Sequence, residues 1–139
     1  MPAAHNRPQQ IVLWVLWISM VNAIVLYQLF LGRGVPQGAD PAGAPLHPVA
    51  LVAVGQVALA TVVRWLLLPR AVTTGKVLVA MILGLALCEG AALLGIFLVP
   101  DALPGTRLLV WLAALAGALQ FAPVYARGAP SPASPFRAE

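Results

Sequence analysis

The sequence predicts an all-α integral membrane protein, built as a bundle of four transmembrane helices. Hydrophobic residues make up 61% of the 139-residue chain and charged residues only 9%, and a soluble globule of this size could not bury so much apolar surface. Four apolar windows each contain at most one charged residue, and each is long enough to cross a hydrocarbon core of about 30 Å as a helix. They lack the strict alternation of barrel strands. The windows cover residues 11–31, 48–68, 77–99 and 108–126.

The first window follows Arg7, in the order found in a signal peptide, but it is too long for the apolar region of one. Residues 31–34, Leu-Gly-Arg-Gly, offer no cleavage site with small residues. We therefore expect a retained helix after a short amino tail at residues 1–10. The Gly- and Pro-rich segment 32–47 is expected to be an irregular connector. In the second window, Arg64 lies about one turn from the end, where it can extend to the membrane interface.

The basic residues indicate how the chain is oriented, because Lys and Arg gather in short cytoplasmic segments. One side of the predicted bundle has only two basic residues, Arg33 and Arg107. Both termini are therefore expected on the cytoplasmic side of a bacterial inner membrane, and the Pro-rich tail 127–139 is expected to be a disordered cytoplasmic extension, or alternatively a docking peptide. The other side has Arg7, Arg70, Lys76, Arg127 and Arg137, with Arg64 just inside the membrane.

Charge and composition argue against several classes of function. The net charge of +4 comes from scattered basic residues at membrane ends, which fits contact with anionic lipid better than binding to nucleic acid. A single cysteine and two distant histidines give no spacing for a metal or haem site. The chain also lacks a nucleophile and base pair and a Gly-rich phosphate loop. We expect no enzyme activity and no cofactor, and the expected partners are the lipid bilayer, further copies of the chain or other membrane subunits.

Glu89 is the strongest candidate for a functional residue, because it lies in the middle of the third apolar window. A charged side chain at the bilayer centre costs about 2.5 to 3.5 kcal/mol on insertion scales. Asn22 and Gln56 can approach the same depth from neighbouring helices, whereas Gln120 is displaced toward the cytoplasmic side. A neutral carboxyl group could bond to these amides, and a deprotonated one could bind a small cation with their help. The alternative is that the polar residues only form hydrogen bonds between helices.

A line of small residues follows the third window and permits close approach of another helix. At 100° per residue these side chains fall within about 40° of one line. We expect ordinary packing within the bundle, with a seam between copies of the chain as the alternative. A weaker stripe on the fourth window contains Ala113 and Gly117. The main stripe consists of Ala80, Gly84, Cys88, Ala91 and Gly95.

Residues 86–96, Ala-Leu-Cys-Glu-Gly-Ala-Ala-Leu-Leu-Gly-Ile, place a carboxylate among small and aliphatic residues. This segment resembles the carboxylate-bearing helix of the proton-binding c subunit of rotary ATP synthases. The resemblance implies a proton or sodium site at Glu89, with Gln56 at most a helper. The preceding helix, however, has only Gly55 where that family has a glycine repeat. The whole chain looks more like small uncharacterised four-span bacterial membrane proteins with a Glu-centred third helix, and that resemblance implies no activity.

Two hypotheses about function follow from these residues. In the first, the chain is a structural or accessory subunit of a membrane assembly, and a neutral carboxyl group at Glu89 fixes the register of the helices. In the second, Glu89 changes its charge state and takes part in ion translocation or sensing. Replacing Glu89 with glutamine separates them, because the amide keeps the shape and most hydrogen bonds while it cannot ionise.

Overall fold

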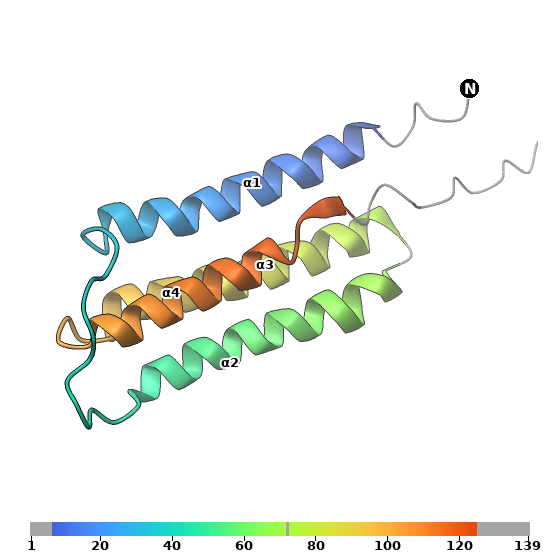
Figure 1. Cartoon of the computed structure of the whole chain (residues 1–139). Helices are drawn as coiled ribbons and strands as arrows, with labels where there is room; N and C mark the ends of the chain where they lie inside the picture. Colours follow the sequence, from blue (N-terminus) through green and yellow to red (C-terminus); the bar gives the residue numbers. More distant parts are fainter. Residues whose placement is uncertain (1–6, 72, 125–139) are drawn as a thin grey trace, which may run out of the picture.

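The computed structural model, which describes residues 7–71 and 73–124, confirms the prediction of an all-α four-helix bundle (Figure 1). No strand is present in the part of the chain that it describes. Residues 1–6 of the amino tail expected at 1–10 and the tail expected at 127–139 lie outside the described residues, whereas residues 7–10 already belong to the first helix. The α-helices are α1 (Arg7–Phe30), α2 (Pro48–Val62), α3 (Thr74–Leu98) and α4 (Pro104–Leu119).

Three helical segments are long and apolar enough to cross a membrane. They are Pro8–Phe30, Pro48–Arg70 and Thr74–Leu98. The fourth helix is shorter, because α4 has 16 residues and so spans about 24 Å at the usual rise per residue. It occupies Pro104–Leu119 and not the whole of the predicted window 108–126. The chain turns after Leu119, and this turn directs Phe121 back into the bundle, where its ring is fully buried.

Helices α3 and α4 form the centre of the bundle. They pack against each other and each contacts both α1 and α2, whereas α1 and α2 make no contact with one another. Figure 1 shows α1 and α2 on opposite sides of the central pair. Two connections, 31–47 and 99–103, lie at one end of the bundle, which we call the loop end. The start of α1 and the connection from α2 to α3 lie at the other, which we call the tail end.

The second helix changes its hydrogen-bonding pattern near the tail end. A π-helical turn at Val63–Leu67 and a 3-10 turn at Leu68–Arg70 continue α2. The Leu68 N–H donates to the Val63 carbonyl, five residues back. Pro69 has no N–H to continue the α-helical ladder, which accounts for the irregularity at this point.

The long connection 31–47 is irregular, and one side chain attaches it to the start of α4. The Asp40 carboxylate accepts hydrogen bonds from the Gly105 N–H at 2.7 Å, the Thr106 N–H at 3.0 Å and the Thr106 hydroxyl. It thereby satisfies N–H groups that have no partner inside the helix. The Thr106 hydroxyl is the main cause that holds the pKa of Asp40 below its ordinary value; burial, the next largest effect, opposes it, and the Thr106 and Gly105 N–H groups lower the pKa further. The connection and α4 are therefore coupled through a charged cap.

Candidate functional site

Glu89 lies near the middle of α3, three residues beyond Ala86 at the midpoint of the Thr74–Leu98 helix. Its side chain is half-buried. Of its neighbours along the chain, Cys88 is buried and Gly90 is half-buried against the other helices. Successive residues on a helix point about 100° apart. Glu89 therefore projects away from the densest part of the core.

The partner of Glu89 is Tyr27, on the peripheral helix α1. The two side chains interact electrostatically, and a phenol can donate a hydrogen bond to a carboxylate. Tyr27 is three residues from the end of α1 at Phe30. Side chains on a helix lean toward its amino terminus, so Tyr27 leans from the loop end toward the interior. This interaction couples α1 to α3 through two polar groups inside the apolar layer.

Gln56 does not belong to this pair. It approaches α3 from α2, and its Oε1 atom lies 3.4 Å from the position that a Cβ atom would occupy at Gly90. That oxygen is buried and has no hydrogen-bond partner among the described residues. Because α1 and α2 make no contact, Gln56 and Tyr27 belong to different interfaces of α3.

Asn22 is also separate from Glu89. Its side chain is exposed, and its Nδ2 atom donates to the Ile18 carbonyl of the same helix at 2.9 Å. The bond satisfies one amide hydrogen locally, as short polar side chains do in helices. Of the three residues expected to share an ion site, Glu89, Gln56 and Asn22, none forms a hydrogen bond or ion pair with another among the described residues.

The small-residue stripe of α3 contacts other helices of the same chain. An added Cβ at Gly84 would overlap the Phe121 ring, and one at Gly95 would lie 2.8 Å from Cγ1 of Val110. On α4, a Cβ at Gly117 would lie 2.9 Å from the Cys88 sulfur. All five residues of the stripe are buried: Ala80, Gly84, Cys88, Ala91 and Gly95. The close packing of α3 on α4 therefore depends on the absence of larger side chains.

At the tail end, two side chains bind the carbonyl groups that end α4. The Trp17 Nε1 atom of α1 donates to the Ala118 carbonyl at 2.9 Å, and the Arg64 Nε atom donates to the Gln120 carbonyl at 2.7 Å. The positive charge of Arg64 also suits the carboxyl end of a helix dipole. The Gln120 side chain in turn donates to the Thr61 hydroxyl at 3.0 Å. Trp17 is thus a second polar link from α1 to the central pair.

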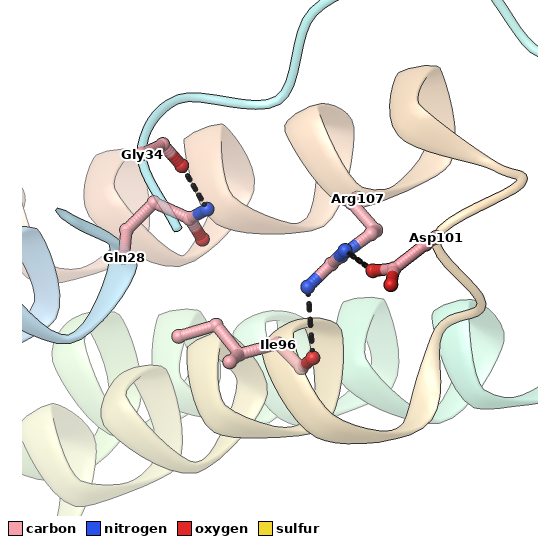
Figure 2. A network of polar contacts seen from close by, with 5 residues as sticks. All are labelled: Gln28, Gly34, Ile96, Asp101 and Arg107. Atoms are coloured by element: carbon pink, nitrogen blue, oxygen red, sulfur yellow. Dashed lines mark hydrogen bonds and ion pairs between the residues drawn. The ribbon is translucent and has the colours of Figure 1, made fainter. Parts of the chain in front are cut away.

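Sequence reasoning missed two polar residues near the end of α1. No local pattern marks Tyr27 as a partner of Glu89, because only the register of α1 against α3 brings the two side chains together. Gln28 is 2% exposed and its Nε2 atom donates to the Gly34 carbonyl at 2.7 Å (Figure 2). The turn residues that follow, Gly32 and Gly34, were the available signal that the chain folds back there.

Comparison of the chain with protein-family models, with curated proteins and with solved structures finds no match.

Proposed function

We propose that this protein is a non-enzymatic, multi-span membrane protein that acts as a structural or accessory subunit of a membrane assembly, with both termini on the cytoplasmic side. In this proposal Glu89 acts as a fixed hydrogen-bonding group that sets the position of α1 against α3. The observation that carries the proposal is the contact of Glu89 with Tyr27.

The way α1 is attached to the bundle supports this role for Glu89. Helix α1 touches only α3 and α4, and its outward side chains are apolar, such as Ile11 and Val15 at 61% and 58% exposed. Lipid solvates such side chains as well as another helix does, so apolar contacts alone select a register poorly. The interaction of Tyr27 with Glu89 and the hydrogen bond from Trp17 to the Ala118 carbonyl each require one register of α1.

The role as a subunit is supported by the outer surface of the bundle. Large apolar side chains are exposed on every helix, including Leu51 on α2, Val79 on α3 and Leu109 on α4. Lipid or the helices of other membrane proteins can cover such a surface.

A double-mutant cycle tests the structural role. Glu89→Met removes the hydrogen-bond acceptor at similar length, whereas Glu89→Gln retains one. We expect Glu89→Met and Tyr27→Phe to lower the free energy of unfolding in detergent micelles, and Glu89→Gln to change it less. Tyr27→Phe should cost little more once Glu89→Met is present, because the bond is already lost. If the losses in unfolding free energy of Glu89→Met and Tyr27→Phe simply add in the double variant, the proposed interaction between Tyr27 and Glu89 is wrong.

The subunit role has its own test, by native gel electrophoresis of membranes solubilised in mild detergent. We expect the tagged chain to migrate in a complex with other membrane proteins, and Glu89→Gln to leave that complex intact. Migration only as a single copy of the chain, under conditions that preserve other membrane complexes, would contradict the role of a subunit.

A second candidate function is a proton- or cation-binding subunit that uses Glu89. The pairing of a carboxyl group with a phenol favours it, because both groups can carry a proton. On this reading Glu89→Gln would abolish function while the fold remains intact. The Asn22 amide bonds to its own helix, and the Gln56 Oε1 atom has no hydrogen-bond partner among the described residues. Neither amide is thus bonded to Glu89, so the structural role is preferred.

A further inference from the structure

The loop end of the bundle contains a cleft that combines two guanidinium groups with apolar side chains. Its volume is about 380 Å³, and it lies where α1, α3 and α4 meet their connections. Polar and apolar residues share the lining. They include Leu31, Arg33, Ile96, Phe97, Asp101 and Arg107.

Arg107 is held in place by contacts with the end of α3. Its Nη2 atom donates to the Ile96 carbonyl at 2.9 Å, and its Nη1 atom pairs with the Asp101 carboxylate (Figure 2). The side chain of Arg107 is 13% exposed, and its Nε atom is buried without a hydrogen-bond partner among the described residues. A guanidinium group has five N–H donors, so Arg107 is oriented by two contacts and retains donors for a further acceptor.

Arg33 is the second guanidinium group, and it has no such contacts. Its side chain is exposed and has no hydrogen-bond or ion-pair partner in the described part of the chain. Its backbone adopts a φ of 59°, a left-handed conformation that favours glycine. An arginine thus occupies a left-handed position between two glycines, Gly32 and Gly34, where a third glycine would fit with less strain. A fixed guanidinium group and a free one therefore border the same cleft.

The charge and position of the cleft define the ligand. Two guanidinium groups against the single Asp101 carboxylate leave one excess positive charge. The cleft also lies at the ends of the membrane-spanning segments Pro8–Phe30 and Thr74–Leu98, which is the depth of lipid headgroups. Just inside it, Phe97 and Leu31 are 64% and 49% exposed. The ligand should therefore be anionic at one end and apolar at the other.

We propose that this cleft binds an anionic phospholipid, with the phosphate between Arg33 and Arg107 and an acyl chain along Leu31 and Phe97. Planar guanidinium groups match the oxygens of a phosphate and can donate two parallel hydrogen bonds to it. The exposed Arg33 closes over the phosphate, while Arg107 supplies the ordered side of the site. Asp101 restricts the site to one net negative charge by repelling more highly charged headgroups.

The test uses delipidated full-length protein in micelles of a neutral detergent. Phosphatidylglycerol, phosphatidylcholine and inorganic phosphate are titrated separately, and affinity is taken from the rise in unfolding temperature with ligand concentration. We expect phosphatidylglycerol to bind more tightly than phosphatidylcholine. Arg33→Gln should lower the affinity for phosphatidylglycerol by about tenfold, as expected for a lost hydrogen bond to a charged group. Arg70→Gln, an exposed arginine at the tail end, is the matched control and should not alter it.

Arg33→Gly separates a binding role from a structural one. Glycine suits the positive φ at this position, so the variant should unfold at a higher temperature without lipid and yet lose the same tenfold in affinity. Equal affinity of Arg33→Gln and the parent for phosphatidylglycerol would overturn the proposal. Binding of inorganic phosphate that depends on Arg33, with no preference for the lipid, would overturn the assignment to a phospholipid.

Discussion

Replacing Gly84 with alanine should destabilise the bundle, because the Phe121 ring fills the space beside this glycine. A Cβ atom at Gly84 would lie 2.8 Å from Cε2 of Phe121 and closer still to two other ring atoms. The ring is fully buried, so it cannot swing into lipid. Overpacking of this kind costs about 1 to 3 kcal/mol, partly offset by about 1 kcal/mol from the better helix propensity of alanine.

Gly55→Ala is the matched control for this prediction. Gly55 lies within α2, and no atom lies within 4 Å of a Cβ added there. The Gly55→Ala variant should therefore gain the better helix propensity of alanine without any steric clash. The difference in free energy of unfolding between the two variants, about 1 to 3 kcal/mol, isolates the clash. Unfolding in mixed micelles, followed by tryptophan fluorescence, measures it.

The second control is Phe121→Leu in the Gly84→Ala background. A smaller side chain at residue 121 should relieve the overlap, so the two substitutions should cost less together than the sum of their separate costs. Coupling between residues in contact is about 0.5 to 3 kcal/mol. If Gly84→Ala is as stable as Gly55→Ala, or if the two effects add, Phe121 does not pack against Gly84 as described.

Three further predictions concern other contacts. The pKa of Asp40 is lower in the folded chain than its ordinary value, so the ionised carboxylate should stabilise the fold above the ordinary pKa. This stabilisation should be lost as the pH falls through the folded pKa. In Asp40→Asn the free energy of unfolding should therefore depend less on pH over that acidic range. Trp17→Phe removes the bond to the Ala118 carbonyl and should cost about 0.5 to 1.5 kcal/mol in unfolding free energy. Cys88 is fully buried, so a maleimide should label it only on unfolding, and rapid labelling of the folded protein would contradict its place in the core.

The fold class could be predicted from the sequence because it depends on composition and on the lengths of apolar runs. A helix wheel also grouped the five residues that include Gly84 and Gly95, since their relative directions depend only on the geometry of one helix. The end of the fourth helix could not be placed in this way. Pro123 indicates that the helix ends before it, but it does not show that α4 ends at Leu119. The inward turn of Phe121 depends on packing, because its ring fills the space beside Gly84.

The candidate site was harder to predict, because its contacts depend on register between helices. The depth of Glu89 follows from its position in the third window, whereas its pairing with Tyr27 requires the offset of α1 against α3. Asn22 lay at a suitable depth, but the rotation of α1 leaves it exposed. The Asp40 cap joins residues more than sixty positions apart, which no local pattern indicates.

The most direct test of the proposed role of Glu89 is pH-dependent infrared difference spectroscopy of the protein in lipid. A carboxyl band that disappears in Glu89→Gln is assigned to Glu89, which separates it from Asp40 and Asp101. If Glu89 is a fixed hydrogen-bonding group of the bundle, this band should stay constant between about pH 5 and 9 and should not respond to sodium. A band that changes with pH over that range, or shifts with sodium, would contradict the structural role and would support ion binding at Glu89.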